Sequence, residues 1–425
     1  MRSSSPNHQP TSTQIHASSR GSSITRETHD EVMTPNYAPM KMIPARARGS
    51  WLWDTQGKDY LDFAAGIAVS VLGHSHPDLV AVLNEQAQKF WHVSNLMTNE
   101  PAIELAQRLC ELTFAEKVFF ANSGAEVNEA ALKLARRYAF DNFDEKKTEI
   151  VAFNNGFHGR TFFTVSVGGQ PKYSDGFGPK PAGITHLPFN DVDALRGFFA
   201  EKGDQVCCVM LEPIQGEGGV NPASREFVQV IRECCNQHDA LMILDEVQTG
   251  VGRSGKLYVY EKLGIAPDIL TTAKGLGGGF PIAAMLTTDK IAKSLGVGVH
   301  GSTFGGNPMA CTVANKVLEL VTESDLLEEV DRKSEFLVKE LTALGTRKDL
   351  FSGVRGEGLL LGCELSDKWK DRSRDVLTAC MEEGLMVLVA GQNVIRLAPP
   401  INISHGDIEE GLARMERAIE KLEAT

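Results

Sequence analysis

Residues 240–248 read ALMILDEVQ, in which five consecutive apolar residues lead directly into two carboxylates. A continuous apolar run is typical of a strand that is covered on both faces, as the strands of parallel sheets are. Comparable runs lie elsewhere along the chain, at 117–120, 149–153, 206–211 and 269–272. Segments with helical periodicity separate these runs. The sequence therefore predicts β-α-β units around a mostly parallel sheet, which is an α/β fold.

The clearest helical pattern follows the run at 117–120. Its apolar positions recur at i, i+4, i+7 and i+11, which is one face of a helix: Val127, Ala131, Leu134 and Tyr138. From about residue 313 the pattern changes to amphipathic helices and short strands. We therefore predict four parts, which are a disordered tail (1–23), an N-terminal segment that packs with the small domain (24–76), a large domain (77–312) and a smaller α/β C-terminal domain (313–425).

The first 26 residues differ from the rest, with eight serines, three arginines and no acidic residue. This composition resembles an organelle transit peptide, but the segment has no convincing apolar face. We therefore expect a disordered tail and a cytoplasmic protein. A mitochondrial or plastid location is the alternative if the tail is a transit peptide.

Composition excludes several classes of protein. Lys and Arg total 43 against 55 Asp and Glu, so the net charge of −12 disfavours nucleic-acid binding. No stretch approaches the roughly 20 apolar residues that a membrane span needs. The eight cysteines include no C-x-x-C pair, which argues against a zinc ribbon or a thioredoxin-like site. We expect them to be reduced and buried.

Residues suited to ligand binding follow the predicted strands, and ligands of open α/β sheets gather at the carboxyl ends of strands. After 117–120, Ser123 and Glu126 fit the S-x-x-E capping box, which predicts a helix start. The free N–H groups and positive dipole end of such a helix form an anion site. A simple helix cap is the plainer interpretation of the same residues.

The other strand ends carry chemically distinct side chains. Phe157 offers a ring face, and Arg160 offers a fork for a carboxylate. Asp245 ends a buried strand, where a carboxylate is costly unless it is paired. Lys274 stands between an apolar run and a glycine cluster, where a partly desolvated amine can attack a carbonyl. Singly, each also fits a surface loop or a capped turn.

Three nearby motifs resemble binding sites for other ligands, namely a dinucleotide, a nucleotide phosphate and a metal. Residues 250–255 match G-x-G-x-x-G, but no acidic residue follows at the spacing that a dinucleotide site needs. The same stretch nearly matches a P-loop, but Leu257 replaces the required hydroxyl residue. His74 and His76 lack further ligands at metal-binding spacing, so we predict a structural turn and no metal site.

In combination the strand-end residues suit one cofactor, pyridoxal 5'-phosphate. Its phosphate needs the helix start, its ring needs a stacking partner, its ring nitrogen needs a carboxylate, and its aldehyde needs an amine. The large domain would hold it.

The sequence from about residue 24 onwards resembles the class III, fold-type I pyridoxal-phosphate aminotransferases. It is most similar to bacterial acetylornithine aminotransferases and the related succinylornithine transaminases. The motifs that carry the resemblance are Gly66-Ile67-Ala68-Val69, Leu72-Gly73-His74, Asn122-Ser123-Gly124-Ala125-Glu126, Phe157-His158-Gly159-Arg160-Thr161, residues 212–219 (EPIQGEGG), Asp245-Glu246-Val247-Gln248, residues 273–279 (AKGLGGG), residues 300–308 (HGSTFGGNP) and Arg396-Leu397-Ala398-Pro399-Pro400.

The resemblance implies roles for several residues around the cofactor. Lys274 would bind the cofactor covalently and later shuttle a proton. Asp245 would pair with the ring nitrogen, and Gln248 would hydrogen-bond the ring 3-oxygen. Phe157 would stack on the ring.

The resemblance also implies a phosphate site that two subunits share. Gly124 and Ala125 would supply backbone N–H groups to the phosphate. Thr303 would reach the phosphate in the neighbouring subunit, so a homodimer is implied.

The remaining implied roles concern small-molecule substrates. Arg160 would bind a substrate carboxylate, with Ser302 beside it. Arg396 would bind a carboxylate of glutamate, and Glu217 would pair with Arg396 when another substrate is bound. Tyr37 would lie at the substrate entrance.

The implied reaction is a ping-pong transfer of the δ-amine of N2-acetylornithine or N2-succinylornithine to 2-oxoglutarate, which gives glutamate and an N-acyl-glutamate semialdehyde. Ornithine aminotransferases carry Tyr where this sequence has Ile67, and an apolar side chain cannot hydrogen-bond a free α-amino group. Succinyldiaminopimelate or ornithine/GABA aminotransferases are alternatives, as is a non-catalytic relative that only binds ligand. The sequence leaves open whether the role is arginine synthesis or catabolism.

Overall fold

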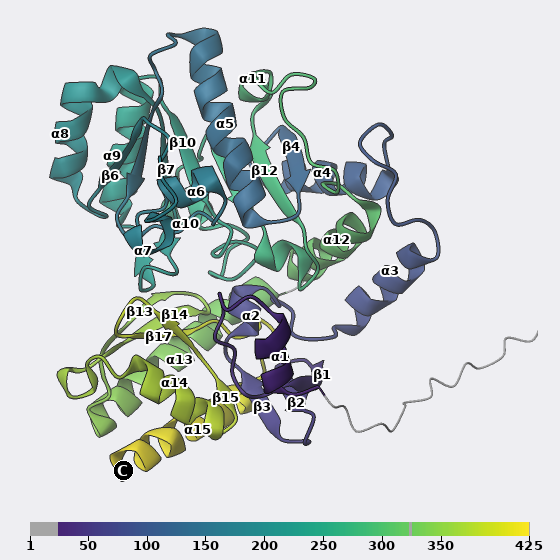
Figure 1. Cartoon of the computed structure of the whole chain (residues 1–425), viewed down its shortest axis with the longest axis vertical. Coiled ribbons are helices and arrows are strands. Elements are labelled where there is room, and N and C mark those ends of the chain that lie inside the picture. Colours follow the sequence, from purple (N-terminus) through teal and green to yellow (C-terminus); the bar gives the residue numbers. More distant parts are fainter. Residues whose placement is uncertain (1–23, 323–324, 425) are drawn as a thin grey trace, which may run out of the picture.

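The structure is a computed structural model that describes residues 24–322 and 325–424 (Figure 1). The predicted tail at 1–23 lies outside the described residues. A seven-stranded sheet forms the centre of the large domain, in the order β4-β12-β11-β10-β7-β5-β6. In chain order its strands are β4 (Lys117–Ala121), β5 (Glu149–Phe153), β6 (Ile184–Leu187), β7 (Val206–Leu211), β10 (Leu241–Asp245), β11 (Ile269–Thr272) and β12 (Ala283–Thr287).

The strands from β11 to β6 pair in parallel, whereas β12 is antiparallel to both of its neighbours. The predicted α/β fold with a mostly parallel sheet is confirmed, and each predicted apolar run coincides with one of these strands to within one residue. Strand β10 begins and ends one residue later than predicted, so Asp245 is itself the last residue of the strand. Strands β6 and β12 were not predicted.

Helices cover both faces of this sheet, which explains the continuous apolar runs. Along β5, Ile150 and Ala152 pack with helix α5 (Gly124–Asn142), whereas Val151 and Phe153 pack with α8 and α9. The predicted helical face is confirmed, because its four residues are all buried in α5. The helices from α3 to α12 are α3 (Pro77–Ala87), α4 (Glu100–Leu112), α5, α6 (Phe162–Val167), α7 (Pro171–Ser174), α8 (Val192–Lys202), α9 (Arg225–Gln237), α10 (Val259–Leu263), α11 (Asp289–Ala292) and α12 (Pro308–Thr322).

The C-terminal part contains a second sheet of order β13-β14-β17-β16, which two helices contact, while a third helix packs on those two. Its elements are α13 (Leu326–Lys348), β13 (Phe351–Glu357), β14 (Leu360–Leu365), α14 (Ser373–Glu382), β15 (Leu385–Met386), β16 (Leu388–Ala390), β17 (Val394–Leu397) and α15 (His405–Glu423). The short elements between the large-domain strands include β8 (Ile214–Gln215), β9 (Asn221–Pro222) and the 3₁₀ turns η1 (Gly203–Gln205) and η2 (Lys274–Gly277), and η3 (Asp367–Trp369) lies in the C-terminal part.

The N-terminal segment lies against this C-terminal part in Figure 1. Its elements are α1 (Arg26–Val32), β1 (Pro44–Arg48), β2 (Trp51–Asp54), β3 (Asp59–Asp62) and α2 (Ala65–Ala68). Strand β15 joins β1, β2 and β3 in one sheet and runs parallel to β3. Two distant parts of the chain therefore share a sheet.

All eight cysteines are free, and all but Cys110 are buried, as expected. None of the helices between residues 24 and 424 combines the length and the apolar character that a membrane crossing requires.

Candidate active site

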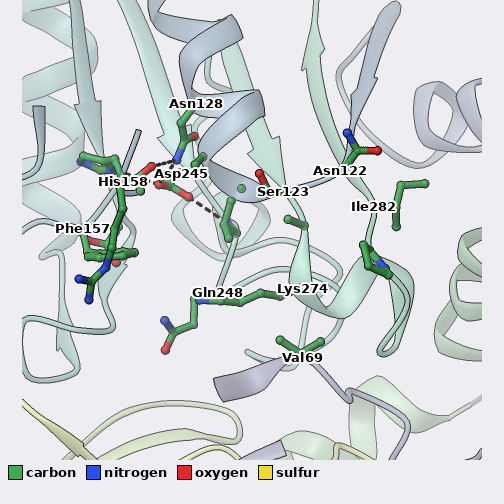
Figure 2. A pocket seen from close by; sticks show the side chains of 18 of the residues that line it. Val69, Asn122, Ser123, Asn128, Phe157, His158, Asp245, Gln248, Lys274 and Ile282 are labelled. Atoms are coloured by element: carbon green, nitrogen blue, oxygen red, sulfur yellow. Dashed lines mark hydrogen bonds and ion pairs between the residues drawn. The ribbon is translucent and has the colours of Figure 1, made fainter. Parts of the chain in front are cut away.

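A cavity of about 430 Å³ opens at the carboxyl ends of the central strands (Figure 2). Its lining includes seven of the residues that the sequence singled out, which are Gly124, Ala125, Phe157, Arg160, Asp245, Gln248 and Lys274. They come from four separate stretches of chain. The sheet brings them together because parallel strands present their carboxyl ends at one edge.

The start of helix α5 forms one wall. Ser123 is the N-cap, and its hydroxyl accepts the backbone N–H of Glu126 at 3.4 Å. The carboxylate of Glu126 accepts the backbone N–H of Asn122 rather than that of Ser123, so the capping box reaches one residue further back than expected. A Cβ at Gly124 would lie 2.8 Å from Val247, so glycine allows the close approach of helix and loop. The first N–H groups of a helix have no partner within the helix, which leaves them available to an anion.

Asp245 is buried and rigidly held. Its Oδ2 accepts hydrogen bonds from Asn128 Nδ2 at 2.7 Å and His158 Nδ1 at 2.8 Å, and its Oδ1 accepts the Val247 N–H at 3.1 Å. Asn128 is in turn fixed by Thr271, whose hydroxyl donates to Asn128 Oδ1 at 2.7 Å. Figure 2 shows Asn128 and His158 beside the carboxylate of Asp245. Asp245 can therefore meet a cationic ring nitrogen in a fixed position.

His158 and Asn128 were given no role by the sequence analysis. Burial disfavours a charged imidazole, but the hydrogen bond and the charge of Asp245 outweigh burial, and the pKa of His158 is raised. A protonated His158 would hold the carboxylate of Asp245 in place more firmly. It would not compete for the side of that carboxylate that faces the cavity. The signal in the sequence was the position of His158 inside the Phe157–Arg160 loop.

Lys274 begins the 3₁₀ turn η2 with a φ of 42°, an uncommon backbone conformation for a residue other than glycine. Burial lowers the pKa of its amine, and the charge of Arg396 lowers it further, against the opposing effects of Glu217 and Asp245. No hydrogen bond or ion pair to the Lys274 ammonium occurs within the described part of the chain. An amine with a lowered pKa and free geometry is suited to nucleophilic attack.

Glu212 is a further residue that the sequence analysis left without a role. Its Oε1 accepts the Phe157 N–H at 2.8 Å, and its Oε2 accepts the Gly216 N–H at 3.1 Å. Burial raises the pKa of this carboxyl to about 7. Glu212 thus ties the loop of Phe157 to the segment that leads into Glu217.

Arg160 lies beside two aromatic rings at the cavity. The centre of its guanidinium is 4.2 Å from the ring centroid of Tyr173 and 5.8 Å from that of Phe157. Such stacking leaves the in-plane N–H groups of a guanidinium free to bind a carboxylate. Tyr173 was not anticipated from the sequence.

Arg396 and Glu217 form an ion pair of 2.7 Å between Nη1 and Oε1. The same Nη1 donates to Gln248 Oε1 at 3.0 Å, which connects the pair to the cavity lining. Arg396 is 2% exposed. Burial opposes ionisation of Glu217, but the charge and hydrogen bond of Arg396 prevail and lower its pKa.

Five predicted site residues do not line the cavity, namely Arg396, Glu217, Ser302, Thr303 and Tyr37. Arg396 and Glu217 adjoin it through Gln248. The Ser302 hydroxyl accepts from Asn122 Nδ2 at 3.2 Å, so it adjoins the wall formed by the start of α5. Thr303 is exposed and lies in a separate small hollow with Ser94 and Asn95. Tyr37 is 73% exposed. Their roles stay predictions.

The motifs that resembled dinucleotide, phosphate and metal sites have structural explanations. Residues 250–255 form consecutive turns and not a strand-to-helix junction. His74 Nε2 pairs with Asp62 Oδ2 at 2.7 Å, and His76 precedes helix α3. Between residues 24 and 424, outside the gap at 323–324, no group of three or more His, Cys, Asp or Glu could hold a metal.

The donor set fits pyridoxal phosphate on chemical grounds. The start of α5 provides an anion site, Asp245 provides a fixed negative charge, and Lys274 provides an amine with a lowered pKa. All three face one cavity.

Comparison with known proteins agrees with this chemistry. The sequence matches the family described as aminotransferase class-III over residues 32–419. It is 58% identical to an acetylornithine aminotransferase of Vibrio cholerae over 400 residues, which cover 94% of this chain and 98% of the relative. It is 54% identical to a succinylornithine transaminase/acetylornithine aminotransferase of Pseudomonas aeruginosa, over 94% of this chain and 98% of the relative.

Among solved structures, the crystal structure of an N-acetylornithine aminotransferase from Stenotrophomonas maltophilia K279a is similar, with a TM-score of 0.80. The two sequences are 39% identical, and the match covers 91% of this chain and 97% of the other.

Proposed function

Because the chain belongs to the class-III aminotransferase family, we propose that it transfers the δ-amino group of an N2-acylated ornithine to 2-oxoglutarate. The chain is an aminotransferase and uses pyridoxal phosphate. N2-acetylornithine is the first candidate donor and N2-succinylornithine the second, because relatives named for these substrates match nearly the whole chain. The products are glutamate and an N-acyl-glutamate semialdehyde.

The observation that carries the proposal is the arrangement of Lys274, Asp245 and the start of α5 around one cavity. When bound, pyridoxal phosphate supplies an aldehyde that reacts with amines and a ring that accepts negative charge. Lys274 would bind the aldehyde through Nζ and would later move a proton at the substrate carbon that carries the amine. Asp245 would hold the proton on the ring nitrogen, and Phe157 would cover one ring face.

The substrates require two arrangements of one site. Both amino donors carry a carboxylate. Arg160 would bind this carboxylate near the rings of Phe157 and Tyr173. Glutamate brings a second carboxylate, for which Arg396 is suited once it leaves Glu217. An acylated ornithine brings a neutral arm, and the Arg396–Glu217 pair then stays closed. A buried arginine without a partner would be costly, which is the physical reason for such a gate.

We also propose a homodimer. Large apolar side chains are exposed near Thr303, including Trp91 at 65%, Leu96 at 94%, Met97 at 66% and Phe304 at 58%. Exposed apolar patches on this scale are typical of interfaces. In the dimer, Thr303 would reach the phosphate site of the neighbouring subunit. Light scattering after size exclusion tests this point, and a monomer with full activity would contradict it.

For location, we propose the cytoplasm, in keeping with eight free thiols. The proposed reaction is tested by offering the purified enzyme N-acetylornithine, N-succinylornithine, N-succinyldiaminopimelate and ornithine, each with 2-oxoglutarate. We expect the acylated ornithines to have the highest kcat/KM. A preference for free ornithine would contradict the proposal.

A further inference from the structure

The segment between Asp62 and His74 contains an unusual backbone. Ala65, Gly66, Ile67 and Ala68 all have positive φ, at 45°, 62°, 67° and 61°. Left-handed residues normally occur singly and are mostly glycine, and a β-branched residue such as Ile67 is a marked exception. Helix α2 is therefore a single left-handed turn in which three of the four residues are strained.

This turn is closed by local hydrogen bonds. The backbone N–H of Ala68 donates to Ala64 O at 2.9 Å, and the N–H of Val69 donates to Ala65 O at 2.7 Å. Neither bond removes the strain, because a left-handed conformation brings each Cβ close to the following carbonyl. A strained backbone persists only where the surrounding structure holds it in place.

The carboxylate of Asp62 is that support. Its Oδ1 accepts the backbone N–H groups of Ala64 at 2.9 Å and Ala65 at 2.8 Å, which are the residues that enter the turn. Its Oδ2 accepts His74 Nε2 at 2.7 Å. Asp62 is 1% exposed, so its hydrogen bonds are not in competition with bulk water. The buried guanidinium of Arg253 also interacts with its charge.

His74 is itself anchored to a different element. Its backbone exchanges two hydrogen bonds with Gly49, at 2.9 and 2.8 Å, just before strand β2. Gly73 leaves no room for a side chain here, because a Cβ would lie 2.8 Å from Gly49 O. His74 therefore connects Asp62, and through it the turn, to the sheet of the N-terminal segment.

The turn leads directly into the active site. Val69 lines the cavity that holds Lys274 and Asp245. Figure 2 shows Val69 beyond Lys274, on the side of the cavity away from Asp245 and Asn128. Ile67 is 44% exposed on the same turn. The turn thus presents Val69 to the cavity and leaves the apolar side chain of Ile67 partly exposed beside it in the chain.

We propose that the Asp62–His74 pair is a positioning pair that holds the left-handed turn and so sets the apolar wall for the acyl-bearing arm of the amino donor. This inference rests on the proposed function for the identity of that arm. Neither residue touches the reacting atoms. Their effect is transmitted through the backbone of residues 64–69, whereas glutamate is held by the two arginines.

The test measures KM and kcat for each amino donor in a His74→Ala variant. We expect KM for N-acetylornithine to rise about tenfold with a much smaller change for glutamate. This is less than the roughly 10²-fold loss that a 1 Å misplacement can cause, because His74 acts only through the backbone of the turn. His74→Gln keeps a donor for Asp62 and should behave like the wild type. His238→Ala is a matched control, because His238 pairs with Asp204 at 3.0 Å and has a similar side-chain exposure, 17% against 21%, outside the cavity lining.

A second variant separates positioning from general loss of structure. Ala68→Gly removes the steric penalty of a left-handed residue, because glycine adopts positive φ readily. In the His74→Ala background it should restore KM for N-acetylornithine towards the wild-type value. Unchanged KM values in His74→Ala, equal changes for both donors, or failure of Ala68→Gly to restore KM would overturn the proposal. If the wild type rejects acylated ornithines, the proposed function fails, and the same variants tested with the accepted donor still decide the role of the pair.

Discussion

Replacing Glu217 with alanine should change the two half-reactions in opposite directions. In the structure, Glu217 Oε1 lies 2.7 Å from Arg396 Nη1 in an ion pair, and Arg396 is almost fully buried. Without Glu217, the carboxylate of glutamate has no internal competitor for Arg396. The acylated ornithine, in contrast, would be bound beside a buried arginine that has lost its partner.

The size of the effect follows from the burial of the pair. Breaking a fully buried ion pair costs about 3–5 kcal/mol. Glu217 retains 23% exposure of its side chain, and Gln248 still accepts from Arg396 at 3.0 Å, so both features reduce the penalty. We expect about 2 kcal/mol, which corresponds to a roughly 30-fold loss in the acylornithine half-reaction.

Single-turnover spectroscopy measures each half-reaction separately. Glu233→Ala is a suitable control, because Glu233 pairs with Arg196 at 3.4 Å on the surface, where half of each side chain is exposed. Such pairs contribute little. If Glu217→Ala slows both half-reactions by one common factor, Glu217 is a structural residue and the gate does not exist.

Three further predictions concern single residues. Lys274→Ala should lower turnover by at least about 10²–10⁴-fold, the contribution of proton transfer alone, while the purified protein still binds some pyridoxal phosphate; steady-state rates and cofactor absorbance check both parts, and wild-type turnover would contradict the assigned role. His158→Phe should leave Asp245 with one fewer donor at Oδ2 and slow the chemical step more than it weakens substrate binding, as a fall in kcat at similar KM would show; a change in KM alone would count against it. Burial raises the pKa of Glu246 to about 7, from an unfolded value near 4.5, so the folded state binds more protons at this group. Its contribution to stability is therefore present below about pH 4.5 and is lost as pH rises through about 7. In urea unfolding, this group should therefore lower the free energy of unfolding by up to about 3 kcal/mol between pH 5 and 8. The Glu246→Gln variant should lack this decline, and an identical dependence of stability on pH in both proteins would refute the prediction.

The fold was largely predictable because its determinants are local. Each buried strand is a continuous apolar run, and the face of α5 repeats with helical spacing. Strand β12 was missed because its antiparallel place between β11 and β4 depends on pairing with residues distant in sequence. The parallel partnership of β15 with β3 has the same origin, since two residues carry no periodic signal.

The site was predictable where a residue's chemistry is unusual for its position in the sequence. Asp245 and Lys274 stood out at the ends of apolar runs. Asn128, Glu212 and Tyr173 did not, because a helix face, a strand end and a short helix are ordinary places for them. Their roles arise only when the fold places Asn128 against Asp245 and Glu212 beneath the Phe157 loop. The left-handed turn at 65–68 was equally hidden, because only one of its residues is glycine.

The central claim, that the δ-nitrogen of an acylated ornithine passes to 2-oxoglutarate, can be measured directly. The enzyme is given N2-acetylornithine labelled with ¹⁵N at the δ position and unlabelled 2-oxoglutarate, and the glutamate formed is examined by mass spectrometry. The account predicts that the glutamate carries the label, and that donor labelled only at the α position yields unlabelled glutamate. Unlabelled glutamate from the δ-labelled donor, or no glutamate at all, would contradict it.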